Sequence, residues 1–258
     1  MKQVTAGDIY DFLDSFAPFA TAMDFDNAGF LVGDRDVPVS SVLLSLDITP
    51  GVVEEAAQLG AQLIVSHHPV IFDPLKRLIP HTAPYLLARH GIAAVCAHTN
   101  LDLAPGGVNT CLAGALGLRN VRTLREYRES GLAEGLMGEL EQEYDPRGFA
   151  VYVKQALHCG GLKYVDGGKK VKTVGLCSGG GAELLPDAAE KGLDAFVTAD
   201  TKHHQLLLAA QSGVTLVDAG HFCTEDVVII PLQKRLSERF PAVSFRKSRV
   251  MRDPAEYL

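Results

Sequence analysis

The sequence predicts an α/β protein built from two related halves, each with a mixed sheet. Short runs rich in Val, Ile and Leu alternate with stretches of helical pattern, and the same strand–helix–strand order occurs in both halves. With 258 residues, 47% of them hydrophobic, the chain is long enough to bury two cores. We place the halves at residues 1–124 and 125–258, with a glycine-rich junction at about 125–170.

The first half opens with an amphipathic helix that residues 5–8 begin, capped by Thr5 or Asp8, and continues to a polar segment, residues 24–29. Asp, Asn and Gly in that segment are typical of a turn, and the alternative is a polar loop beside a functional site. Residues 42–46 then predict a buried strand, residues 51–59 a helix that ends at Gly60, and residues 61–65 a second buried strand. The two strands should be parallel.

His67 and His68 directly follow the second of these strands, and Asp47 follows the first. Neighbouring strand residues point to opposite faces, so we expect the two imidazoles to diverge and to serve two metal ions more easily than one. The alternative is a pair of histidines that hydrogen-bond to the backbone of nearby loops. Asp47 fits either this edge of the sheet, where α/β folds bind ligands, or the start of the next helix.

Residues 92–97 predict another buried strand, which is followed by His98 and Asp102. In the second half, strands at 171–177 and 195–200 flank a helix at about 182–191, and a second pair, His203-His204, follows. This order repeats that of the first half, down to the histidine pair, although strand–helix–strand units are common enough for the match to be coincidence.

The last buried strand, residues 214–218, is followed by His221 and Glu225. If a helix begins at Gly220, the two side chains lie one turn apart on the same face. Such a pair can bind a divalent ion, and the alternative is a helical salt bridge.

Composition excludes several classes of protein. The net charge of −7 argues against a dedicated nucleic-acid-binding role, although one local basic cluster exists, at Arg119, Arg122, Arg125 and Arg128. The five cysteines form no C-x-x-C pair, which argues against a disulfide framework or a zinc ribbon. We expect a cytoplasmic protein, because the sequence carries neither a signal-peptide pattern nor an apolar run of membrane-spanning length.

The side chains that follow these strands make a consistent set of metal ligands: His67, His68, Asp102, His221 and Glu225. Imidazole and carboxylate suit Zn, Mn, Fe or Ni better than thiolate-preferring metals. Five ligands, one of them a carboxylate able to bridge, fit two divalent ions. We therefore expect the two halves to face a central metal cleft.

Four segments together resemble one family, the "GTP cyclohydrolase 1 type 2 homolog" proteins, also described as NIF-three-like dinuclear-metal-centre hexameric proteins. The segments are residues 24–29, 66–69, 97–102 and 220–225. The resemblance implies the same five ligands, a toroidal homohexamer, and His98 close to the metals without being a principal ligand. Two positions depart from the family pattern: Phe25 stands where Trp is frequent, and Ala199 where Gly is usual.

Two functions remain open at this point. The first is a metal-dependent hydrolase acting on a nucleotide or another phosphorylated or heterocyclic small molecule, with His98 or His204 moving the proton. The second is a non-enzymatic metal-binding assembly or interaction protein. A third hypothesis, nucleic acid handled in the lumen of a ring, rests on the arginine cluster alone.

Overall fold

A computed structural model describes residues 3–258, and its internal contacts divide the chain into two compact units. Unit 1 comprises the chain through Ala104 together with Ile229–Arg252, and unit 2 comprises Pro105–Val228 together with Asp253–Leu258. This division differs from the expected halves in two respects. Residues 105–124 belong to the second unit, and a late segment returns to the first.

Unit 1 contains a mixed five-stranded sheet in the order β1-β4-β3-β2-β11. Its strands are β1 (Gly29–Val32), β2 (Ser41–Ser45), β3 (Leu63–Ser66), β4 (Ala93–Cys96) and β11 (Ser244–Lys247). Its helices are α1 (Ala6–Phe16), η1 (Phe19–Thr21), α2 (Pro50–Gln58), α3 (Ala83–His90), α4 (Thr99–Leu103) and α10 (Ile229–Arg239). Only β1 runs antiparallel to its neighbour, β4.

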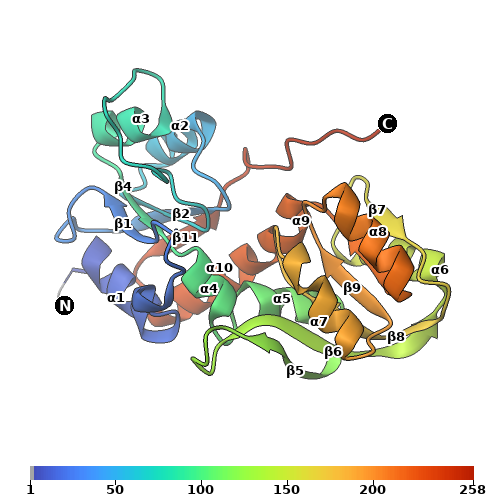
Figure 1. Ribbon diagram of the computed structural model, residues 1–258. Helices are drawn as coiled ribbons and strands as arrows, with labels where there is room; N and C mark the ends of the chain where they lie inside the picture. Colours follow the sequence, from blue (N-terminus) through green and yellow to red (C-terminus); the bar gives the residue numbers. More distant parts are fainter. Residues whose placement is uncertain (1–2) are drawn as a thin grey trace. The chain divides into compact units, whose positions relative to one another are not determined.

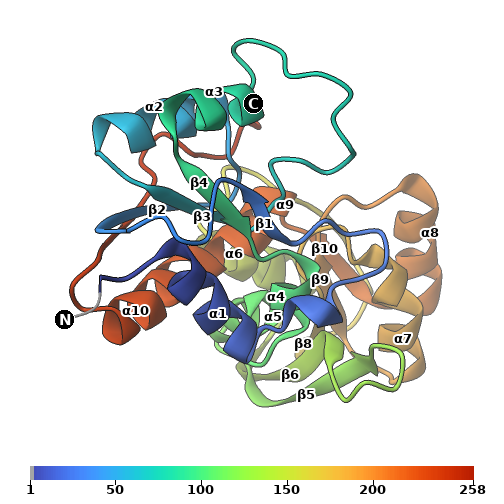
Figure 2. The same cartoon turned by 90° about the vertical axis from the view of Figure 1, so that its left-hand side faces the viewer.

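The predicted strand–helix–strand unit of unit 1 is confirmed, since β2 and β3 pair in parallel around α2. Thr49 caps α2 by accepting a hydrogen bond from the backbone N–H of Val52, and Pro50 occupies the first turn. Figures 1 and 2 show α2 and α3 on one face of this sheet and α1 and α10 on the other. Both faces of the central strands are therefore covered, which explains why those strands are continuously apolar.

Unit 2 contains a mixed six-stranded sheet in the order β5-β6-β8-β9-β10-β7. Its strands are β5 (Arg119–Glu126), β6 (Ala133–Tyr144), β7 (Lys163–Val165), β8 (Val171–Leu176), β9 (Ala195–Thr198) and β10 (Thr215–Asp218). Its helices are α5 (Val108–Ala115), α6 (Pro146–Ala156), η2 (Ala182–Leu184), α7 (Leu185–Glu190), α8 (His203–Ser212), α9 (His221–Glu225) and η3 (Asp226–Val228). The expected mixed α/β class is thus confirmed.

Two apolar clusters lie on the sheet of unit 2. One packs α5 and α6 against it and includes the fully buried Phe149. The other packs α7 and α8 against it and includes the fully buried Phe196. The stretch read from sequence as a junction is a long β5–β6 hairpin followed by α6. Among the described residues, no helix is both long and apolar enough to cross a lipid bilayer.

The internal repeat is confirmed at the level of single hydrogen bonds. Gln62 N donates to Ser41 O in unit 1, and Asp194 N donates to Thr173 O in unit 2. Each unit has three parallel strands that pair in sequence order, β2-β3-β4 in unit 1 and β8-β9-β10 in unit 2. The third strand of each set also pairs with an antiparallel strand, β1 in unit 1 and β7 in unit 2. A five-residue helix follows the third strand in both units, α4 or α9.

The histidine pairs do not take part in this repeat. Ser66 O and Thr198 O accept equivalent hydrogen bonds from Ala97 N and Ala219 N, so the residues that correspond to His67-His68 are Ala199-Asp200. His203 and His204 instead begin α8, and both are exposed. The similarity of the two pairs in the sequence is therefore coincidental.

Candidate metal centre

Three histidines of unit 1 converge where the parallel strands end. The rings of His67 and His68 lie with centroids 5.0 Å apart, and that of His98 lies 5.2 Å from His67 and 5.5 Å from His68. Each offers one ring nitrogen, and these atoms all lie within 4.8 Å of one another. The expected divergence of His67 and His68 is wrong, because β3 ends at Ser66 and strand alternation ends with it.

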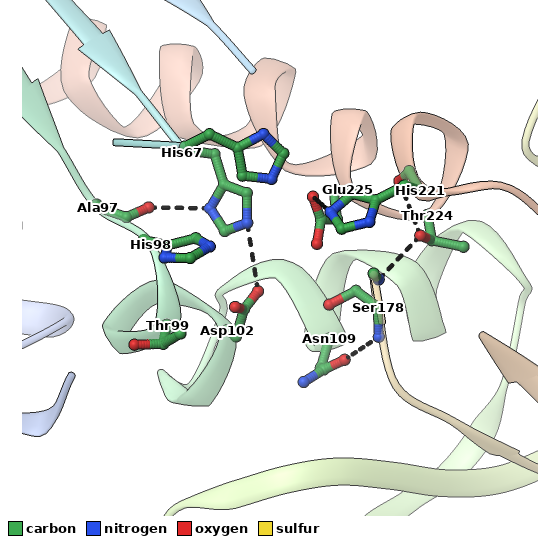
Figure 3. Close-up of polar contacts among 12 residues, drawn as sticks. His67, Ala97, His98, Thr99, Asp102, Asn109, Ser178, His221, Thr224 and Glu225 are labelled. Carbon is green, nitrogen blue, oxygen red and sulfur yellow. Dashed lines mark hydrogen bonds and ion pairs between the residues drawn. The ribbon is translucent and has the colours of Figure 1, made fainter. Parts of the chain in front are cut away.

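A hydrogen bond fixes the orientation of each of these rings. Nδ1 of His67 lies 2.9 Å from the carbonyl oxygen of Ala97 (Figure 3), Nδ1 of His68 lies 2.8 Å from Asp47, and Nδ1 of His98 lies 2.7 Å from Asp26. A carbonyl or a carboxylate can only accept a hydrogen bond, so Nδ1 carries the hydrogen in each ring. In the neutral rings the lone pair is therefore on Nε2, and this nitrogen is the one available to a metal ion.

Asp26 links the polar segment 24–29 to this cluster. Besides His98, its carboxylate accepts hydrogen bonds from Thr99, at 3.1 Å from the backbone nitrogen and 2.5 Å from the hydroxyl. Burial alone would raise the pKa of Asp26, but the hydrogen bonds from His98 and Thr99 outweigh burial and hold it below its ordinary value. Asp26 therefore stays ionised and fixes His98, which supports the reading of the segment as a polar loop beside a site.

Asp102 belongs to the same group. It lies in the short helix α4 that begins directly after His98, and its Oδ1 is 3.6 Å from Nε2 of His67 (Figure 3). Unit 1 thus brings together four of the residues predicted from the sequence as ligands or proton carriers, three imidazoles and one carboxylate. Imidazole together with carboxylate suits Zn, Mn, Fe or Ni.

Unit 2 holds the other predicted ligands. Helix α9 begins after Gly220, as expected, and Nε2 of His221 lies 3.0 Å from Oε2 of Glu225 one turn later (Figure 3). On its other side, Nδ1 of His221 lies 2.6 Å from Asp200. The hydrogen bond to Glu225, with a further contribution from Asp200, raises the pKa of His221 from 6.5 to about 9. This geometry fits both interpretations of the pair. The proton between His221 and Glu225 makes a salt bridge, and a divalent cation bound to both side chains in place of that proton would make them ligands.

A glycine-rich turn after β8 packs against α9. The backbone N–H of Gly179 donates to the hydroxyl of Thr224, and that of Ser178 donates to Asn109 (Figure 3). Gly179 has φ of +56°, and a Cβ there would lie 2.2 Å from Oε1 of Glu225. Only glycine allows the turn to approach this carboxylate so closely.

The other residues singled out in the sequence, His204 and the arginine cluster, do not belong to these groups. His204 is exposed at the second position of α8. The arginine cluster lies on and just after β5, where Arg119 pairs with Glu141, and Arg125 pairs with Glu134 and Asp187. Opposite charges on the same surface therefore neutralise part of this cluster.

Sequence reasoning missed the carboxylates that orient the rings. Asp200 was not singled out at all, although it occupies the repeat position of His68, which was a usable signal. Asp26 was recognised only as part of a turn or polar loop, and Asp47 only as one of two alternatives. Their partners are distant in the chain, since 72 residues separate Asp26 from His98.

Comparison with known proteins gives a consistent result. A family model described as "Duf34/NIF3 (NGG1p interacting factor 3)" matches residues 4–254. A "GTP cyclohydrolase 1 type 2 homolog" from Clostridium perfringens is 31% identical over 261 aligned positions, which cover 97% of this chain and 98% of that protein. The crystal structure of Staphylococcus aureus hypothetical protein SA1388 superposes with a TM-score of 0.91 at 30% identity, covering all of both chains. Reduced HcgD from Methanocaldococcus jannaschii gives a TM-score of 0.81 at 27% identity, covering 96% of this chain and 98% of that one.

Proposed function

Because this chain belongs to the DUF34/NIF3 (NGG1p interacting factor 3) family, we propose that it is a dinuclear metal protein that hydrolyses a nucleotide or a related small molecule. The proposed ligands of the two divalent ions, which are Zn, Mn, Fe or Ni, are His67, His68, Asp102, His221 and Glu225. We further propose the toroidal homohexamer that the family resemblance implies.

The observation that carries the proposal is the common orientation of four histidine rings. In each ring Nδ1 is hydrogen-bonded to an oxygen atom. The pairs are His67 with the carbonyl of Ala97, and His68, His98 and His221 with the carboxylates of Asp47, Asp26 and Asp200 respectively. Outer hydrogen bonds of this kind are a regular feature of metal-ligating histidines. Three of the four rings belong to the proposed ligands His67, His68 and His221, and the fourth is His98, so the same kind of outer bond orients each imidazole of the proposed centre.

The chain's own residues supply the remaining chemistry of hydrolysis. Divalent ions supply Lewis acidity and lower the pKa of the water they coordinate. Nε2 of His98 is the atom we assign to proton transfer, because the bond from Nδ1 to Asp26 fixes the ring and leaves Nε2 as the nitrogen that can exchange a proton. His204 is the second candidate for this role. A His98→Ala variant should lose turnover and a His204→Ala variant should keep it, and the reverse result would exchange the two assignments.

Metal analysis together with turnover tests the proposal. Wild-type protein, purified without a His-tag and loaded with each of the four metals, should bind two ions per chain and hydrolyse at least one member of a nucleotide panel. His68→Ala should lose both properties. His90→Ala, which alters an exposed histidine at the end of α3, should lose neither. If turnover persisted unchanged in His68→Ala, hydrolysis would not depend on the proposed metal centre, and the proposal would be refuted.

The alternative is a metal-binding assembly without catalysis. In that case removal of the ions with a chelator would dissociate the oligomer, and no member of the panel would turn over. Native mass spectrometry before and after chelation separates the two functions, because a hydrolase whose ions serve catalysis should keep its assembly. A monomeric mass before chelation would refute the proposed hexamer.

A further inference from the structure

Two aromatic side chains of unit 1 are exposed beside the segment that orients His98. Phe25 is 63% exposed and Phe72 is 49% exposed. Their ring centroids lie 6.5 Å apart, with the ring planes inclined by 36°. The two residues are 47 positions apart in the sequence, so the fold itself brings them together. Of the phenylalanines in residues 3–258, only these two are exposed, whereas Phe149 and Phe196 are completely buried. The fold thus presents a pair of aromatic rings to solvent at one place.

Residues 25–27 connect both rings to the aspartate that orients His98. Phe25 directly precedes Asp26, whose carboxylate holds His98 and Thr99. Phe72 follows Ile71, whose carbonyl oxygen accepts a hydrogen bond of 2.6 Å from the side-chain amide of Asn27. Asn27 in turn follows Asp26. A single short segment, residues 25–27, thus positions one ring itself, holds the backbone beside the other, and fixes a histidine of the cluster.

The chemistry of phenylalanine limits what such a pair can bind. Its side chain has no donor or acceptor, so it contributes contact area and the π-face of a ring. A planar aromatic or heteroaromatic ring gains most from this surface, because it can stack on a face and every nucleobase has one. A sugar phosphate without a base would gain little from it.

We propose that Phe25 and Phe72 form a stacking platform for the planar heteroaromatic ring of the substrate. The platform binds that ring while the histidine cluster acts on the group attached to it, and this second part rests on the proposed function. The pair is then a determinant of substrate class, because it selects compounds that carry a base over compounds that carry only a phosphate.

The test measures direct binding to the full-length, metal-loaded protein. The probes are the 5′-monophosphates of guanosine, adenosine, cytidine and uridine, with ribose 5-phosphate as the probe without a base. At least one nucleotide should bind more tightly than ribose 5-phosphate. Phe25→Ala and Phe72→Ala should each weaken that binding by about tenfold to a hundredfold, the range expected for loss of one stacking contact. The matched control is Leu75→Ala, at a residue 48% exposed in the same loop as Phe72, and it should leave the affinity unchanged.

Fluorescence gives a second, independent measurement. The chain contains no tryptophan, so Phe25→Trp introduces a single indole at the platform. Stacking of a nucleobase should quench its emission, and ribose 5-phosphate should not.

Several results would overturn the platform. These are failure of every nucleotide to bind at millimolar concentration, equal affinity in wild type and both alanine variants, or emission that ribose 5-phosphate quenches as strongly. Dissociation of the oligomer in the alanine variants would show that the pair contacts another subunit, and loss of metal would show that it only supports the histidines. Metal content and turnover of the wild type are measured separately, so a failure of the proposed function is distinguishable from a failure of the platform.

Discussion

Asp200 lies 2.6 Å from Nδ1 of His221, and it does so from the position that His68 occupies in the repeat of unit 1. The two units therefore use one strand-end position for different purposes. In unit 1 the position supplies a predicted ligand, and in unit 2 it supplies the carboxylate that orients a predicted ligand on the next element. The fold repeats, but the chemistry at equivalent positions does not.

Removal of the Asp200 carboxylate should weaken metal binding without abolishing it. In Asp200→Ala the ring of His221 loses the acceptor that sets its tautomer, and outer-shell losses of this kind reduce metal affinity by roughly 10–100-fold. Titration against a chelator of known affinity measures the effect. Asp200→Asn keeps an acceptor oxygen but no charge, so its metal affinity should lie between those of wild type and Asp200→Ala.

Glu190→Ala serves as the control for that series, because it removes an exposed carboxylate at the end of α7. It should bind metal as wild type does. If Asp200→Ala bound metal as tightly as wild type, the prediction that Asp200 orients His221 as a metal ligand would be wrong.

The sequence predicted those parts of the fold in which local signals agree with tertiary packing. Buried parallel strands appear as continuous apolar runs, and Pro50 and Gly60 mark the helix between two of them. The β5–β6 hairpin was missed because β5 is mostly exposed and β6 contains glycines. Gly135 is there for close packing, since a Cβ would lie 2.5 Å from the side chain of Leu184, a reason that the sequence alone does not reveal.

The site shows the same limit at the level of single residues. Histidines at the ends of strands are visible in the sequence because they stand out from apolar runs. Their carboxylate partners come from turns, where Asp is ordinary, and only the fold pairs Asp47 with His68 across 21 residues.

Gly179→Ala should displace the carboxylate of Glu225. The added Cβ would lie 2.2 Å from Oε1, and Glu225 is only 4% exposed, so the side chain has little room to retreat. We expect metal binding to weaken at least tenfold, together with a moderate loss of stability. Metal content after dialysis and the thermal midpoint measure the two effects.

Gly168→Ala separates the two effects in that experiment. Gly168 also has a positive φ, of +76°, but nothing lies within 4 Å of its Cβ position. This variant should lose stability through backbone strain, by about 1 kcal/mol, and keep its metal. Equal metal loss in both variants would mean that general destabilisation, not the Glu225 carboxylate, controls binding.

The arginine cluster should not make this chain a nucleic-acid-binding protein. Arg119 and Arg125 already pair with acidic neighbours, and the net charge is −7. We expect no binding of single-stranded DNA or RNA at 150 mM salt, a condition in which phosphate contacts alone are weak. Fluorescence anisotropy with labelled oligonucleotides measures this. Micromolar affinity that falls in Arg122→Ala would contradict the prediction.

Asp194 should couple the stability of unit 2 to pH. Its carboxylate accepts hydrogen bonds from the backbone nitrogens of Lys172 and Thr173 and from the Thr173 hydroxyl. Burial would raise the pKa of Asp194, but the bonds from Thr173, with those from Lys172 and Lys169, hold it below 3.8. A depressed pKa in the folded state stabilises the protein above the unfolded value, near 3.8, and this stabilisation is lost as the pH falls through the folded value.

Asp194→Asn should therefore lower the free energy of unfolding at pH 7 by about 1–3 kcal/mol. The difference from wild type should shrink below pH 4. Urea denaturation followed by circular dichroism at pH 7 and at pH 3 measures both values. Asp166→Asn, which alters an exposed acid, should change neither by more than about 0.5 kcal/mol. At the equivalent position of unit 1, the neutral Gln62 accepts the same kind of backbone bond from Ser41, and a carboxamide does not titrate in this range. A difference between Asp194→Asn and wild type that was the same at pH 7 and at pH 3 would contradict this account.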